Sequence, residues 1–172
     1  LAVVAGNESW LFSIYGVDNR YFEVGNWNLA SGRPFAQGEL RSGAAVCVLG
    51  DTVRRQLFGA RDPVGDKVRF GKVSCQVIGL LAAKGQTTTG MDQDDMVLTP
   101  LRTYWRRVAG NQDITSMQIS ARDGVATERA VRDVTHVLRE RRHIAPHEDD
   151  DFTVMDLQEI ARTLAGTTQV LT

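Results

Sequence analysis

Three histidines carry the side chain best suited to binding metals and moving protons near neutral pH. His136, His143 and His147 all fall within one short stretch of the chain. His143 and His147 have the four-residue spacing of a zinc-binding helix, but Pro146 prevents a continuous helix through them. The acidic residues 148–151 could join them in a surface site, although a solvated acidic loop is the simpler interpretation. We therefore expect no metal site in this stretch.

A second group of chemically active side chains lies in residues 82–95, AAKGQTTTGMDQDD. Its three aspartates resemble a calcium loop only superficially, because Met96 and Val97 follow and no suitable glutamate does. The scarcity of apolar residues predicts a long surface loop, and such loops often contact partners. The candidate partner-binding residues are Lys84, Gln86, Asp92, Asp94 and Asp95.

Patterns typical of catalysis are absent from the sequence. Gly85 and Gly90 have the glycine spacing of a phosphate-binding loop, but no Lys-Ser or Lys-Thr follows them. We find no nucleophile with a nearby base and no opposed pair of carboxylates. The sequence predicts no enzyme, no catalytic residue and no cofactor.

The two cysteines leave two interpretations open. Cys47 and Cys75 both fall in predicted strands. In an oxidising compartment they could form a disulfide that stabilises the fold by about 3–4 kcal/mol. We favour the simpler alternative, two small side chains packed as hydrophobic residues, because the sequence does not give the Cα separation that a disulfide requires.

Composition places the chain among ordinary globular proteins. Its 172 residues are 42% hydrophobic and 24% charged, with a formal net charge of −1. That balance gives no reason to expect nucleic acid as a partner. No stretch approaches the 18–20 or so uninterrupted apolar residues of a membrane helix.

The elements that must position these side chains are clearest between residues 46 and 85. An apolar run at 46–49 ends at Gly50-Asp51, where the aspartate can cap a helix over 52–58. After the turn Asp62-Pro63-Val64-Gly65, two β-type runs at 67–70 and 73–81 form a hairpin.

The rest of the chain shows weaker patterns. Residues 2–17 are expected to form strands broken at 6–9, and 37–43 a polar loop. A strand at 96–98 leads to Thr99 as helix cap and a helix ending at Gly110. Alternation predicts a strand at 114–121, and amphipathic spacing a helix at 127–142. A further strand is expected at 152–154 and a helix from 158 onward.

Several short motifs occur in the order found in one transporter family. Tyr21-Phe22-Glu23-Val24 precedes the segment 29–35, LASGRPF, and the later ones are Val48-Leu49-Gly50, Leu57-Phe58-Gly59, residues 62–65, Val77-Ile78-Gly79, residues 92–100 and residues 150–154. Together they cover nearly the whole chain. The sequence resembles the periplasmic core domain of MacB-type (MacB/FtsX/LolC-like) ABC transporter permeases.

The resemblance implies an α+β fold with two lobes. A mixed, β-rich lobe with short helices (18–110, Sabre-like) would be inserted into a porter-like split βαβ lobe (1–17 and 111–156). The N-terminal part of that second lobe would be missing. Residues 157–172 would begin a C-terminal stalk helix that leads to a membrane helix.

It also implies a function. The chain would be the periplasmic domain of an inner-membrane protein of a Gram-negative bacterium. Such a domain couples ATP hydrolysis, by an ATPase domain across the membrane, to export of a substrate from the periplasm. Its partners would be a second permease copy, a periplasmic adaptor protein and an outer-membrane channel. The alternatives are a lipoprotein-releasing or FtsX-like regulatory permease and, from another class, a free periplasmic binding protein.

Overall fold

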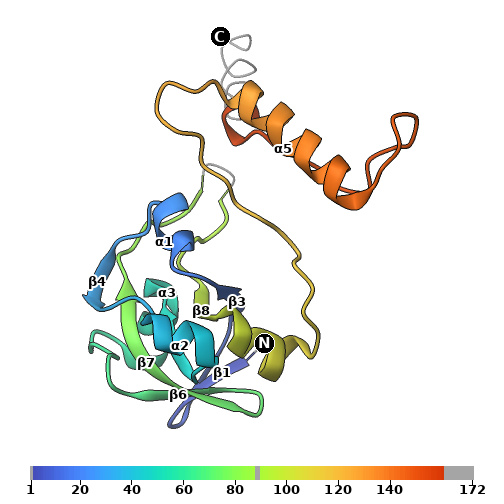
Figure 1. Cartoon of the computed structure of the whole chain (residues 1–172). Helices are drawn as coiled ribbons and strands as arrows, with labels where there is room; N and C mark the ends of the chain where they lie inside the picture. The colour runs from blue at the N-terminus through green and yellow to red at the C-terminus, as the bar shows by residue number, and fades with distance from the viewer. Residues whose placement is uncertain (1, 88–89, 161–172) are drawn as a thin grey trace, which may run out of the picture. The chain divides into compact units, whose positions relative to one another are not determined.

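The computed structural model describes residues 2–87 and 90–160 and divides the chain into two compact units, Leu1–Gln118 and Ile119–Thr172. Figure 1 traces both units from the N-terminus to the C-terminus. Most of the regular structure, including the whole sheet, belongs to the first unit.

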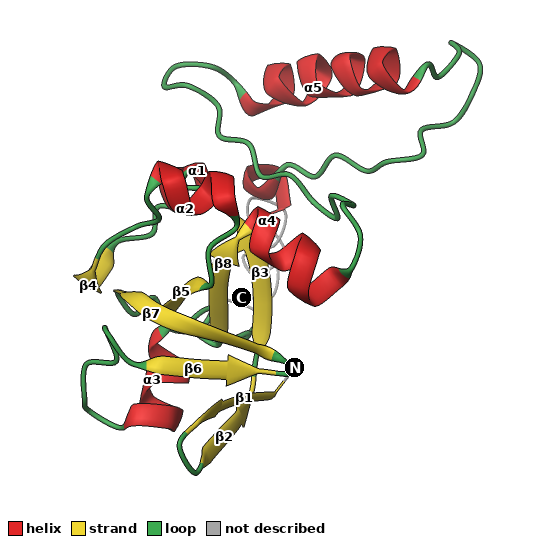
Figure 2. Ribbon diagram, turned by 60° about the horizontal axis from the view of Figure 1, so that its bottom comes forward, coloured by secondary structure: helices red, strands yellow, loops and turns green. Residues whose placement is uncertain are grey.

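The first unit is built on an eight-stranded mixed sheet with short helices (Figure 2). The order of its strands is β2-β1-β6-β7-β5-β8-β3, and β4 also pairs with β7. The elements are β1 (Ala2–Ala5), β2 (Glu8–Leu11), β3 (Ser13–Val17), α1 (Arg20–Val24), β4 (Leu29–Gly32), α2 (Gln37–Ser42), β5 (Val46–Leu49), α3 (Asp51–Phe58), β6 (Lys67–Phe70), β7 (Val73–Leu81), β8 (Met96–Pro100), α4 (Leu101–Tyr104) and the π-helical turn η1 (Trp105–Ala109).

The two outermost strands of the sheet are consecutive in the chain. β2 and β3 occupy opposite ends of the strand order, yet only Phe12 separates them. The sheet must therefore curl until its ends approach one another at this residue. The buried Phe12 ring contacts Phe70 of β6 edge-on, with 6.3 Å between ring centroids.

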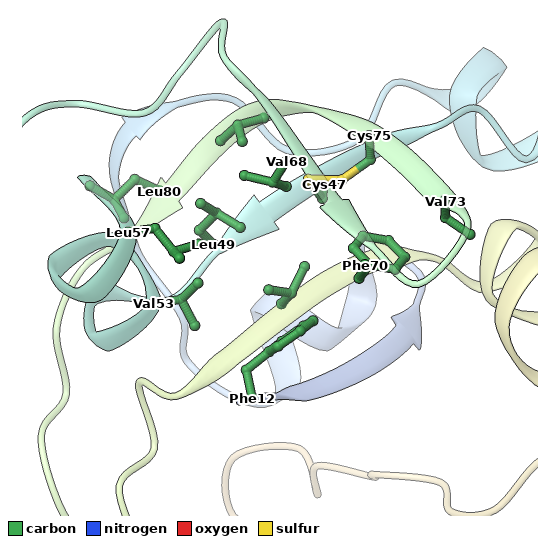
Figure 3. Close-up of a cluster of buried hydrophobic side chains, with 12 residues drawn as sticks. Phe12, Cys47, Leu49, Val53, Leu57, Val68, Phe70, Val73, Cys75 and Leu80 are labelled. Atoms are coloured by element: carbon green, nitrogen blue, oxygen red, sulfur yellow. A yellow bond between two sulfur atoms is a disulfide. The ribbon is translucent and has the colours of Figure 1, made fainter. Parts of the chain in front are cut away.

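Hydrophobic side chains cover both faces of the central strand β5, which explains its uninterrupted apolar run. Cys47 and Leu49 lie in one core cluster with Val53 and Leu57 of α3 (Figure 3). Val46 and Val48 alternate into a second cluster, whose other buried members are Val17, Phe22, Phe35, Ile78, Leu81, Met96 and Leu98. The predicted α+β class and mixed β-rich lobe with short helices are confirmed by this arrangement.

Cys47 and Cys75 form a disulfide, so the preference for two unlinked cysteines was wrong. Their Cα atoms are 6.0 Å apart, within the range that a disulfide spans. The bond joins the neighbouring parallel strands β5 and β7, and both residues are at most 1% exposed. The pairing register of these strands, which brings the cysteines together, is set by tertiary structure and is invisible in the sequence.

Helix boundaries differ from the predictions in three places. Residues 37–42, expected as a loop, form α2, in which Glu39 accepts a hydrogen bond from the Ala36 backbone N–H at 2.7 Å. Gly50, not Asp51, is the N-cap of α3, and Asp51 instead pairs with Arg54 at 2.7 Å. Thr99 lies fully buried within β8, and the helix begins at Leu101.

The strands expected at 114–121 and 152–154 do not form. Both segments lack regular structure, and Met117 and Ile119 are 63% and 58% exposed. Alternating apolar residues make a strand only when a neighbouring strand completes the hydrogen bonds, and the described chain supplies none to these segments.

Within the second unit, the helix predicted at 127–142 is confirmed as α5 (Thr127–Arg142). It ends at His143, whose φ of 58° closes the helix in the left-handed conformation. Arg139 and Arg142 bind Asp150 and Asp151 of the following loop. A helical turn occupies residues 157–160, whereas the rest of the expected stalk lies outside the described residues. No helix in the described ranges is long and apolar enough to cross a bilayer.

Candidate partner-contact loop

Residues 82–95 leave the sheet at the end of β7 and return at β8. Their middle is a narrow antiparallel turn, in which Gln86 bridges to Asp92 and the Thr87 N–H donates to the Met91 carbonyl at 2.8 Å. The Met91 side chain is 68% exposed. The two described flanks of the segment thus pair with each other, and the apolar Met91 side chain beside them is exposed.

Asp94 holds the base of this loop closed. It is 1% exposed, and its carboxylate accepts hydrogen bonds from the backbone N–H groups of Lys84 and Gly85 at 2.8–3.1 Å. A buried carboxylate needs such donors, because an unsatisfied charge costs several kcal/mol. Asp94 therefore sets the shape of the loop and has no surface to offer a partner directly.

Asp92 and Asp95 tie the loop to other elements. The Thr52 hydroxyl of α3 donates to Asp92 at 2.7 Å, and the Trp10 indole N–H of β2 donates to Asp95 at 2.8 Å. The Asp95 carbonyl also accepts the Ser13 N–H of β3 at 3.3 Å. Asp95 thus contacts both end strands of the curled sheet.

Lys84 contacts Trp27, in the segment between α1 and β4. Its ammonium nitrogen lies 3.9 Å from the Trp27 ring centroid and donates to the Gly25 carbonyl. This is a cation–π contact. Burial lowers the pKa of Lys84, and the Asp94 carboxylate partly opposes that shift. Lys84 therefore links the loop to the segment that contains Gly25 and Trp27.

The structure shows how the five predicted contact residues are held within the domain. It brings them together at one loop, but four have partners inside the domain and only Gln86 is exposed without a side-chain bond in the described chain. Sequence reasoning missed Thr52 and Trp10 as anchors, since neither their spacing nor their type marks them. Across the same part of the chain, no three His, Cys, Asp or Glu side chains gather as metal ligands.

A shallow depression elsewhere on the first unit offers no alternative site. It measures about 480 Å³ and is lined by Arg33, Glu39 and the turn at Val64-Gly65. Its two charged groups satisfy each other through a bidentate ion pair with both distances at 2.8 Å. That hydrogen-bonded pair lowers the pKa of Glu39.

The buried disulfide of this curled α+β domain is of the kind that persists in oxidising, extracytoplasmic compartments. The family model of the MacB-like periplasmic core domain matches residues 2–137. The chain belongs to this family of ABC transporter permease domains, and it is a periplasmic domain.

Curated relatives match over nearly the whole chain. "Macrolide export ATP-binding/permease protein MacB" of Syntrophobacter fumaroxidans is 29% identical over 99% of this chain and 31% of its own length. The protein of the same name from Rhodospirillum rubrum is 35% identical over 93% of this chain and 24% of its own. "Pyoverdine export ATP-binding/permease protein PvdT" of Pseudomonas entomophila is 32% identical over 87% and 23%. The chain thus spans between a quarter and a third of the first relatives.

Solved structures share the fold. The periplasmic region of MacB from Actinobacillus actinomycetemcomitans superposes with a TM-score of 0.77 at 25% identity, covering 95% of this chain and 71% of that one. The extracellular domain of the noncanonic ABC-type transporter YknZ from Gram-positive bacteria gives a TM-score of 0.71 at 17% identity, with 90% and 75% coverage. The second likeness concerns the fold alone.

Proposed function

We propose that this domain transmits force in a MacB-type exporter, coupling ATP hydrolysis on the cytoplasmic side to expulsion of a substrate from the periplasm. The observation that carries the proposal is the match to export permeases over nearly the whole chain. ATP hydrolysis would take place in a separate nucleotide-binding domain. Two copies of the domain, an adaptor protein and an outer-membrane channel would complete the path.

The construction of the sheet suits such a role. Force passes through a domain only if the domain moves as a rigid body. The central strands β5 and β7 are cross-linked by a buried disulfide, and side chains pack on both faces of β5. A sheet of this kind resists bending, so a displacement at one end would reach the other.

In the longer protein we propose two lobes. Residues 18–110 would form the Sabre-like inserted lobe together with the strands of residues 1–17, which pair with β6 and β8, and residues 111–156 would belong to a porter-like lobe completed by a segment outside this sequence. Residues 157–172 would start the stalk. The exposed apolar side chains Met117, Ile119 and Val137 would find their packing partners in that completed lobe.

The loop 82–95 is the proposed contact with the adaptor. Hydrogen bonds hold the base of the loop in place, so binding would cost little conformational entropy. Gln86 is the side chain best placed to touch the partner. Lys84, Asp92, Asp94 and Asp95 would act mainly by positioning the loop through the bonds described above.

The full-length permease in proteoliposomes, together with its ATPase and adaptor, provides the test. We expect the adaptor to raise the rate of ATP hydrolysis and to bind the Asp94→Asn and Gln86→Arg permeases more weakly than the wild type. Arg69→Gln, which changes an exposed residue on β6, is the control and should bind the adaptor normally. Failure of the adaptor to bind or stimulate the wild-type permease would refute the proposed function. Normal binding by both loop variants would remove the loop from it.

A further inference from the structure

The arginines of the first unit fall into two groups. Four of them form ion pairs with carboxylates: Arg33, Arg54, Arg55 and Arg61. The other six have no carboxylate within salt-bridge distance in the described chain. Four of those six are exposed on three helical segments: Arg41 of α2, Arg102 of α4, and Arg106 and Arg107 of η1. These four positive charges are thus unbalanced locally, although the chain as a whole has a formal net charge of −1.

Hydrogen bonds between the helices bring these arginines together. Arg102 donates to the Arg41 carbonyl at 2.8 Å, and Arg106 donates to the Ser42 carbonyl at 3.2 Å. Both acceptors lie at the C-terminal end of α2, which is the negative end of a helix. α2 contacts α4, and the two lie side by side in Figure 1.

Each of these two bonds uses only one of the five N–H donors of a guanidinium group. The remaining donors of Arg102 and Arg106 stay available, while the bonds hold the groups at a fixed separation. Glu39, the only acidic residue of α2, is already paired with Arg33. The surface therefore presents several oriented donors and no acceptor that could neutralise them.

The surroundings decide which anionic partner fits. None of the exposed large apolar side chains of the described chain belongs to α2, α4 or η1. A membrane-binding surface normally combines basic residues with exposed large apolar side chains, which insert between the lipids. The fixed, forked guanidinium groups instead match carboxylates held at defined positions.

We propose that Arg41, Arg102, Arg106 and Arg107 form a docking surface for an acidic segment of a partner protein. This inference does not depend on the exporter function, because it rests only on the charges and hydrogen bonds of this surface. A partner helix or strand with two or three aspartates or glutamates on one face would be the matching structure. Binding would weaken with salt, since exposed charge pairs are screened.

Amide chemical shifts of the 172-residue chain, titrated with a hexaglutamate peptide at low salt, provide the test. We expect shifts that centre on α2, α4 and η1. The variant Arg41→Gln/Arg107→Gln removes two guanidinium groups that make no hydrogen bond in the described chain. The variant Arg102→Gln/Arg106→Gln removes the two guanidinium groups that donate to carbonyls of α2. Each should weaken peptide binding about tenfold or more.

The control variant Arg20→Gln/Arg69→Gln removes the two exposed arginines that lie elsewhere on the unit without a carboxylate partner. It carries the same change of charge and should bind hexaglutamate as the wild type does. Equal weakening in control and surface variants would overturn the proposal by showing a non-specific charge effect. So would the absence of binding, or arginine-dependent binding to phosphatidylglycerol vesicles that exceeds binding to the peptide.

Discussion

Gly50 shows how closely the loop 82–95 packs on the sheet. A Cβ atom at this position would lie 2.1 Å from the Asp94 carbonyl oxygen and 3.1 Å from that of Met96. The Gly50 N–H also donates to the Met96 carbonyl at 2.8 Å. No side chain can enter here unless the backbone of the loop moves away.

Gly50→Ala should therefore destabilise the domain by about 3 kcal/mol, the upper range for overpacking a well-filled site. Chemical denaturation measures the change. Gly38→Ala is the matched control, because nothing lies within 4 Å of its Cβ position in α2 and alanine favours a helix. Equal stability of the two variants would contradict the close packing described.

The ionisation of a single residue, Glu39, makes the free energy of unfolding depend on pH. Its hydrogen bonds with Arg33 lower its pKa in the folded protein below the usual value of about 4.3. A carboxyl group with a lowered folded pKa contributes stability above its unfolded pKa, and that contribution is lost as the pH falls through the folded pKa.

We thus expect the free energy of unfolding to fall on acidification below about pH 4.3. Glu39→Gln should reduce the difference between the free energies of unfolding measured at neutral and at acidic pH. Arg33→Gln should reduce the same difference in the free energy of unfolding, because it removes the partner that lowers the pKa of Glu39. An unchanged pH dependence in both variants would contradict this role.

At the scale of elements, strands and helices whose signals are local could be predicted. The hairpin of β6 and β7 follows from alternation around Gly71-Lys72, and α5 from its apolar spacing. α2 was missed, because the sequence QGELRS has almost no apolar face. The strand expected at 114–121 does not form even though its alternation is clear, because no strand among the described residues pairs with it. The loop 82–95 was found, whereas the roles of its aspartates depend on Thr52 and Trp10, which are distant in sequence.

The disulfide between β5 and β7 leads to a prediction at this scale. It closes a loop between residues 28 apart, which corresponds to about 3–4 kcal/mol in the chain-entropy model. Cys47→Ala/Cys75→Ala should lower the free energy of unfolding by at least that amount, because the cavity left in the core adds to the loss.

Mass spectrometry after alkylation gives the matching control. Wild-type protein unfolded without reductant should remain unalkylated, and it should take up two labels after reduction. Alkylation of both cysteines without reductant would show that no disulfide forms.

At the scale of the whole molecule, the domain should be a monomer or a weak dimer when isolated. In the proposed exporter, membrane helices and ATPase domains would supply most of the contacts between copies. Sedimentation velocity at micromolar concentration should show a single species near 19.0 kDa. A tight dimer at that concentration would contradict the expectation.

The order of the strands has a consequence for how the chain folds. β6 and β7 can pair as soon as both have been made, but β3 pairs in parallel with β8, matching Ser13 with Met96 far along the chain. Contacts between distant residues form slowly. We expect the hairpin to nucleate folding and the β3–β8 pairing to complete it. Until β8 emerges from translocation, β3 and β5 would offer unpaired edges to other chains, so this interval is when aggregation would threaten the domain most.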